Sequence, residues 1–180
     1  MPWHPDHKAH SRERILRAAA RLFTRHGFAG VSIDTLMQEA GLTRGAFYAH
    51  FASKSELYAE AIVEAARQGV ERLGPSAPSA ARARYLSREH LESETGLCPL
   101  ASLVSDVAQQ DPLVRESYTR LFQGFIDRIA GGGEEERQQS LQRAVMMIGG
   151  LAIARTLSDE ALAEELLRAC RQGIEADAGP

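Results

Sequence analysis

The chain has 180 residues, of which 44% are hydrophobic and 25% are charged, and its net charge is −3. This length allows one large domain, or a small module and a larger one, with a buried core. No run of eighteen apolar residues occurs, and the first ten residues lack the apolar stretch of a secretory signal, so we expect a soluble cytoplasmic protein without a membrane span. Two cysteines, Cys98 and Cys170, are too few and too far apart for a disulfide framework or a zinc site.

Charge is distributed unevenly along the chain. Residues 1–60 contain eight Lys or Arg against six Asp or Glu, whereas residues 61–180 contain thirteen against eighteen. Five of the six histidines also lie in the first third. A basic N-terminal part on an acidic body suits a module that faces phosphates.

The first helices are predicted by apolar periodicity and by glycine stops. Residues 1–10 contain two prolines and three histidines without helical periodicity, which predicts a flexible arm. From Ser11 to Gly27, apolar residues recur at spacings of three and four, so we expect an amphipathic helix with a glycine cap. Ser32 is a good N-cap for a second helix, which Gly41 ends.

A third, short helix follows directly. Thr43 is its expected N-cap, and Phe47 and Phe51 stand one turn apart, so both can point into a core. The order of helix, glycine, apolar residue, cap and short helix is typical of a helix-turn-helix, here over about residues 32–51. Ser53 and Glu56 then form a capping-box pattern, which predicts a fourth helix from Lys54.

The rest of the chain also reads as helical. Glycine and prolines interrupt the periodicity at residues 74–79, and five further helices are expected at about 80–92, 99–109, 112–130, 134–157 and from 159 onward. No stretch alternates long enough to predict a strand. The sequence therefore predicts an all-α protein with about nine helices, divided into an arm (1–10), a helix-turn-helix module (11–60) and a helical body (61–180).

The third helix carries the chemistry that a reader of DNA requires. Such a helix presents side chains to base edges in the major groove while its flanks hold phosphates. Thr43 and Arg44 stand at its start, and arginine matches the O6 and N7 acceptors of guanine. Gly45 allows close approach of the backbone. Groups suited to phosphate contacts follow at Tyr48, His50 and Lys54.

The segment GFAGVSIDTLMQEAGLTRGAFYAHFASKSELY resembles the N-terminal domain of the TetR family of bacterial transcriptional regulators, most specifically over residues 11–62. The resemblance implies a three-helix DNA-binding head and a helical body for ligand binding and dimerisation. It implies a homodimer that a small-molecule effector releases from operator DNA. The implied contacts to operator DNA come from the residues already described and from the helix before them: Ser32, Thr35, Thr43, Arg44, Tyr48, His50 and Lys54.

The body offers candidates for an effector pocket and a dimer interface. Aromatic and apolar residues that are either pocket lining or ordinary core are Tyr85, Leu103, Tyr118, Phe122, Phe125 and Met146. Small and apolar residues that would permit close packing of two protomers are Gly149, Gly150, Ala152, Leu162 and Leu166. Two-fold symmetry of such a dimer implies a palindromic operator.

Cys98 precedes Pro99 at a predicted helix start, where backbone amides favour the thiolate form. The pattern G-x-C-P-L-A-S-L also resembles a segment in a subset of TetR-like regulators, some of which respond to electrophiles. Two interpretations remain, a redox or electrophile sensor and a buried structural thiol. Cys170 lies on the apolar face of the last predicted helix and is expected in the core.

Two functions stay open from sequence. The first is a dimeric repressor of transcription, responsive to a ligand or a thiol reagent, whose partner is double-stranded operator DNA. The second is a helical carrier or enzyme with a vestigial helix-turn-helix. The sequence contains no paired carboxylates, Ser/His/Asp set, phosphate-binding glycine loop or metal-ligand spacing, so we expect no catalytic residues, cofactor or metal ion.

Overall fold

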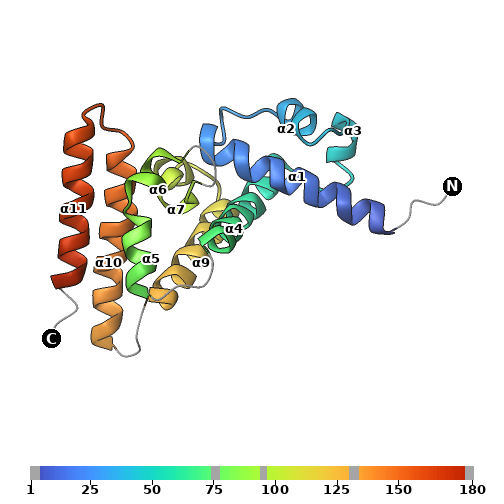
Figure 1. Cartoon of the computed structure of the whole chain (residues 1–180). Helices are drawn as coiled ribbons and strands as arrows, with labels where there is room; N and C mark the ends of the chain where they lie inside the picture. Colours follow the sequence, from blue (N-terminus) through green and yellow to red (C-terminus); the bar gives the residue numbers. More distant parts are fainter. Residues whose placement is uncertain (1–4, 74–77, 94–96, 130–133, 177–180) are drawn as a thin grey trace. The chain divides into compact units, whose positions relative to one another are not determined.

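The computed structural model describes residues 5–73, 78–93, 97–129 and 134–176 (Figure 1). These residues form eleven helices and no strand, which confirms the all-α class. The helices are α1 (Pro5–His26), α2 (Ile33–Glu39), α3 (Arg44–Phe47), α4 (Lys54–Leu73), α5 (Pro78–Tyr85), α6 (Arg88–Glu92), α7 (Pro99–Ser102), α8 (Val104–Val107), α9 (Pro112–Ile129), α10 (Glu134–Ala154) and α11 (Glu160–Ala176).

The expected number of nine helices is corrected to eleven because two predicted helices are each divided. Ser87 takes extended backbone angles and caps α6, its hydroxyl accepting from the His90 amide at 3.2 Å, so α5 and α6 are separate. Leu103 has φ −115° and ψ 5°, outside the helical range, and separates α7 from α8. Apolar periodicity does not reveal such single-residue breaks.

The first helix begins earlier than the sequence predicted. Residues 5–10, expected to be part of a flexible arm, form the first turns of α1, while residues 1–4 lie outside the described part of the chain. Pro5 is compatible with this start because the first-turn amides of a helix have no intrahelical acceptor in any case.

The chain divides into two compact units. The first comprises Met1–Val70 and Thr95–Arg120, and the second Glu71–Glu94 and Leu121–Pro180. We predicted a boundary at residue 60, without the return of residues 95–120 to the first unit. Packing explains that return, since Leu103, Val107 and Val114 are buried in the same apolar core as residues of α1, α2 and α4.

Aromatic side chains make up much of the core of the first unit. The Phe23 and Tyr58 ring centroids lie 4.6 Å apart, and those of Phe28 and Tyr58 lie 5.3 Å apart. Phe47 and Phe51 are also buried, with exposed fractions of 0% and 2%, which confirms their predicted inward orientation. These contacts anchor α1, the α1–α2 turn, the α3 region and α4 to one another.

Asp106 of α8 accepts hydrogen bonds from two residues of this core. Its carboxylate accepts from the Phe28 amide at 3.2 Å and from the Tyr58 hydroxyl. Gly27, with φ +68°, allows the chain to turn beside it, because a Cβ there would lie 3.0 Å from the Asp106 carboxylate. Burial and the hydrogen bond to Asp106 raise the pKa of Tyr58, so the hydroxyl remains a donor.

In the second unit, α10 and α11 run side by side (Figure 1). A Cβ on Gly150 would lie 2.7 Å from the Cys170 sulfur, so the glycine permits the close approach of the two helices. Cys170 is buried, as expected. Gly150 is buried as well, and its place at a dimer interface stays a prediction.

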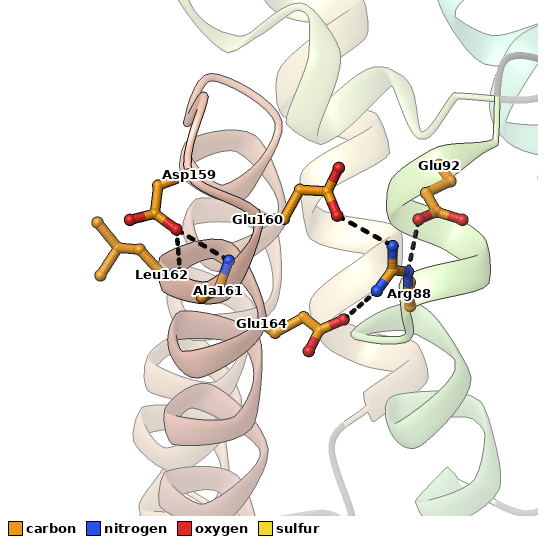
Figure 2. A network of polar contacts seen from close by, with 7 residues as sticks. All are labelled: Arg88, Glu92, Asp159, Glu160, Ala161, Leu162 and Glu164. Atoms are coloured by element: carbon orange, nitrogen blue, oxygen red, sulfur yellow. Dashed lines mark hydrogen bonds and ion pairs between the residues drawn. The ribbon is translucent and has the colours of Figure 1, made fainter.

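A surface network joins α6 to α11 (Figure 2). The Arg88 guanidinium contacts Glu92 and Glu164, each at 2.5 Å, and Glu160 at 3.2 Å. Asp159 caps α11 by accepting from two backbone amides of its first turn, at 2.9 and 3.1 Å (Figure 2). Because the Arg88 side chain is 54% exposed, solvent screens these ion pairs, and they contribute little to the free energy of unfolding.

Replacing Asp106 by alanine is expected to lower the free energy of unfolding by about 2 kcal/mol, because it leaves the Tyr58 hydroxyl and the Phe28 amide without their acceptor. Tyr58→Phe removes a donor and should cost less, about 1 kcal/mol. Chemical denaturation monitored by circular dichroism measures both changes. Ser105→Ala, on the exposed side of the same helix, is the control, and an equal effect of all three would contradict the role of Asp106.

Candidate nucleic-acid interface

The turn between α2 and α3 has the geometry that a helix-turn-helix requires. The Gly41 amide donates to the Gln38 carbonyl at 2.9 Å and the Leu42 amide to the Met37 carbonyl at 2.8 Å, the two hydrogen bonds of a Schellman motif. Gly41 has φ +64°, which favours glycine over other residues. The guanidinium of Arg14 also donates to the Gly41 carbonyl, at 3.3 Å, and ties α1 to the turn.

One side of helix α3 is buried in the core, and the opposite side is exposed. Phe47 is fully buried and supports the helix, whereas the neighbouring Tyr48 is 59% exposed. The two rings meet edge to face, with centroids 5.1 Å apart, so the packing of Phe47 orients Tyr48 outward. The outer face of α3 is therefore positioned by the core and available to a partner.

Thr43 and Gly45 occupy the start of this open face. Thr43 has the extended backbone of an N-cap, but its side chain makes no capping hydrogen bond, contrary to our expectation. Its hydroxyl is exposed at the helix start. A Cβ on Gly45 would meet nothing within 4 Å, so packing within the chain does not require glycine there. Close approach to a partner stays a prediction for Gly45.

Arg44 is paired with an acidic residue that the sequence interpretation overlooked. Its Nη1 donates to Oδ2 of Asp34, in the first turn of α2. Both side chains are largely exposed, at 58% and 63%. The pKa of Arg44 is raised, first by this hydrogen bond, then by the Asp34 charge and by Tyr48. The helix-turn-helix thus brings an acid on α2 beside the main base-reading candidate on α3.

Ser32 and Thr35 lie together at the start of α2. The Ser32 hydroxyl accepts from the Thr35 amide at 3.0 Å, which confirms the predicted N-cap, and the two side-chain oxygens are 2.8 Å apart. Both residues are exposed. Their predicted contacts with phosphate are compatible with this exposure.

The Lys54 ammonium makes contacts within the chain that the sequence did not suggest. Its ammonium donates to the Phe28 carbonyl and lies 4.1 Å from the centroid of the Phe28 ring. Partial burial lowers the pKa of Lys54, while the Asp106 charge acts in the opposite direction. Ser53 caps α4 as predicted by accepting from the Glu56 amide at 3.0 Å, although the Glu56 carboxylate accepts from the Ala52 amide rather than from that of Ser53.

The ring nitrogens of His50 are not exposed as a contact with phosphate would require. Both ring nitrogens are shielded from solvent and lack a hydrogen-bond partner among the described residues. Desolvation, followed by the charges of Lys8 and Arg12, lowers the pKa of His50. A phosphate contact by this side chain would require the ring to turn outward.

The six predicted pocket residues do not converge on one described cavity. Leu103 and Tyr118 belong to the first unit and the other four to the second. Leu103 is core, and Tyr85 packs on Phe125 with centroids 5.9 Å apart. Two cavities, of about 200 Å³ beside Arg88 and about 310 Å³ among α1, α4 and α9, are lined by none of the six. The effector site therefore stays a prediction.

Cys98 occupies the N-cap position of α7, with Pro99 in the first turn as expected. It is partly buried, and its carbonyl accepts from the Ser102 hydroxyl at 3.0 Å. Burial, and then the nearby Cys98, raise the pKa of Tyr118 to about 12, and the Tyr118 hydroxyl donates to the Leu100 carbonyl at 2.7 Å. The pKa of a predicted pocket residue thus responds to Cys98.

An exposed apolar stripe runs along the surface of α10. Val145 and Ile153 are 65% and 52% exposed, two turns apart on the helix, and Leu141 adds 39% one turn earlier. On α11, Leu162 is 47% exposed, and Leu166 is less exposed, with intermediate burial. Gly149 and Ala152 are partly exposed on α10. Sequence reasoning missed Val145 and Ile153, although their spacing of eight residues could have placed them on one helix face.

The described residues add two general observations. No helix in this part of the chain is both long and apolar enough to cross a membrane. Within the same residues, no three His, Cys, Asp or Glu side chains gather as they would around a metal ion.

Comparisons with known proteins match the N-terminal module. Residues 15–61 match the family described as "Bacterial regulatory proteins, tetR family". The uncharacterized HTH-type transcriptional regulator YerO of Bacillus subtilis is 46% identical over 46 residues, 26% of this chain and 16% of that protein. The HTH-type transcriptional regulator AcrR of Shigella flexneri is 44% identical over 50 residues, 28% of this chain and 23% of that protein. The chain thus spans less than a quarter of the length of either relative.

The fold as a whole also has a solved counterpart. The crystal structure of a TetR-family transcriptional regulator from Cytophaga hutchinsonii matches with a TM-score of 0.76, covering 94% of this chain and 95% of the other. Sequence identity between the two is 15%, so this likeness shows the fold alone.

Acidification should destabilise the wild-type chain more than a His50→Gln variant. Because the folded state lowers the pKa of His50, the unfolded chain binds the proton first, and the free energy of unfolding falls as the pH drops below about 6.5. Urea denaturation between pH 7.5 and 5 measures the difference. His26→Gln, at an exposed position of α1, serves as the control, and parallel pH profiles for wild type and His50→Gln would refute the prediction.

Proposed function

We propose that this chain is a regulator of the TetR family, as the match of residues 15–61 supports, and that it represses transcription as a homodimer bound to a palindromic operator. A small-molecule or thiol-reactive signal would release it. The curated relatives cover only the DNA-binding module, so the regulated genes and the signal cannot be transferred from them. Those relatives are regulators, which gives no support to a carrier or an enzyme.

The observation that carries this proposal is the outer face of α3. Thr43, Arg44 and Tyr48 are exposed together on a helix whose opposite side is anchored by fully buried Phe47. Arginine and hydroxyl groups are the donors that base edges and phosphates accept. A buried anchor keeps them in a fixed register, which direct reading of a sequence requires.

The homodimer is supported by the apolar stripe of α10. Val145, Ile153 and the exposed Leu162 of α11 remain uncovered within the single chain, although large apolar side chains normally avoid water. A second copy would cover these side chains with its own. Gly149 and Ala152 lie on the same helix and would allow the helices to approach closely.

Arg44→Ala and Lys54→Ala should affect DNA binding in different ways. Loss of Arg44 removes a base contact, so the affinity for the selected operator should fall by about 1–3 kcal/mol and the preference at one base pair should relax. Loss of Lys54 removes a phosphate contact and should weaken binding to all duplexes alike, with a salt slope lower by about 1 for each protomer. Fluorescence anisotropy at several salt concentrations distinguishes them.

Arg17→Ala is the matched control for these variants, because Arg17 is an exposed arginine of α1 that pairs with Glu13 at 2.5 Å. Its selectivity should equal that of the wild type. Binding that does not depend on salt, or an Arg44→Ala variant with unchanged base preference, would contradict the assigned roles.

Val145→Glu should convert the dimer to a monomer, because it places a carboxylate on the apolar stripe that we propose lies between two protomers. Sedimentation velocity measures the mass, and circular dichroism reports whether the helices persist. Gln142→Glu introduces the same charge at an exposed position of the same helix and should leave the dimer intact. A Val145→Glu variant that sediments as a dimer would remove the support for this interface.

A further inference from the structure

We propose that Asp34 is a specificity-determining residue of the DNA interface, which holds one end of the Arg44 guanidinium and disfavours sites where Arg44 finds no base-edge acceptors. The inference rests on the proposed function and deepens it, because it assigns an acidic side chain of α2 to the selectivity of α3. Neither the spacing of the two residues in sequence nor their types suggested this pairing.

The ion pair with Asp34 occupies only one nitrogen of the Arg44 guanidinium. The ion pair with Asp34 uses Nη1 of the guanidinium, whereas Nε and Nη2 lie outside that pair. A guanidinium carries five N–H donors in a planar fork, and two parallel donors suffice for O6 and N7 of guanine. Asp34 can therefore hold the side chain without competing for the edge that meets the base.

The exposure of the pair argues against a large contribution to the free energy of unfolding. Both side chains are more than half exposed, and ion pairs of that kind contribute little to folding because solvent screens them. Arg44 has several flexible bonds, so an exposed arginine without a partner would lose rotamer freedom on binding. Pairing with Asp34 restricts the Arg44 rotamers in the free protein, so less rotamer freedom is lost when DNA binds.

The charge of Asp34 also lowers the affinity for DNA sites of wrong sequence. Non-specific binding depends on attraction between cationic side chains and phosphates, and a carboxylate beside α3 weakens that attraction. At a site with the correct guanine, the bidentate contact of Arg44 offsets this repulsion. Arg44 gains from being held in place only at a site that offers those acceptors, so Asp34 lowers the affinity for other sites without an equal loss at the correct one and widens the difference in affinity.

Helix α2 supplies a matched control. Glu39, in the last turn of the same helix, pairs with Arg21 at 2.8 Å, and its side chain is 46% exposed. Glu39→Gln removes the same charge from the same helix as Asp34→Asn, but it does not touch Arg44. A difference between the two variants therefore reports on the contact with Arg44 and not on net charge.

The test first selects duplexes from a random pool with the full-length wild-type chain. Affinities of wild type, Asp34→Asn, Glu39→Gln, Arg44→Ala and the Asp34→Asn/Arg44→Ala double variant are then measured for the selected and a scrambled duplex. Asp34→Asn should bind the scrambled duplex more tightly and reduce the affinity ratio about five- to tenfold. Glu39→Gln should leave the ratio within about twofold, and Asp34→Asn should not change it in the Arg44→Ala background.

The outcomes separate this inference from the function on which it rests. Failure of the wild type to enrich any sequence would overturn the proposed function and the inference together. Enrichment by the wild type with an unchanged ratio in Asp34→Asn would overturn the inference alone. An equal change in Glu39→Gln, or the same change without Arg44, would also overturn it, because the effect would then not pass through the ion pair.

Discussion

The carboxylate of Asp106 is the polar contact on which the helix-turn-helix module depends. It joins three segments that lie far apart in sequence, since it accepts from the Phe28 amide in the α1–α2 turn and from the Tyr58 hydroxyl in α4. The Phe28 carbonyl and ring in turn hold the ammonium of Lys54. A proposed phosphate contact is thereby linked to α8 through one residue of a turn, so Asp106 and Lys54 both contact Phe28.

Much of this module could be predicted from sequence because its signals are local. Glycine stops at Gly27 and Gly41, the Ser32 and Ser53 caps and the inward Phe47 all act over a few residues, and the structure confirms them. Asp106 could not be predicted, since its partners lie 78 and 48 residues away along the chain. Local patterns also missed the breaks at Ser87 and Leu103, where a single residue leaves the helical range.

The candidate site itself was predictable in its residue types but not in its electrostatics. Sequence reasoning treated Arg44, His50 and Lys54 as three free cationic or polar groups. The structure pairs Arg44 with Asp34, shields the nitrogens of His50 and engages Lys54 with Phe28. Each difference arises from a tertiary neighbour, and each changes how readily the side chain can meet DNA.

Helix α3 illustrates why the core and the interface cannot be considered apart. Four residues are too few for a helix to persist alone, because a single turn gains few hydrogen bonds against the cost of nucleation. Its register depends instead on buried Phe47 beneath it and on the Gly41 turn before it. Substitutions of either would disturb the orientation of Arg44 and Tyr48 without touching them, so a loss of DNA binding identifies a contact residue only when the fold of α3 is shown to persist.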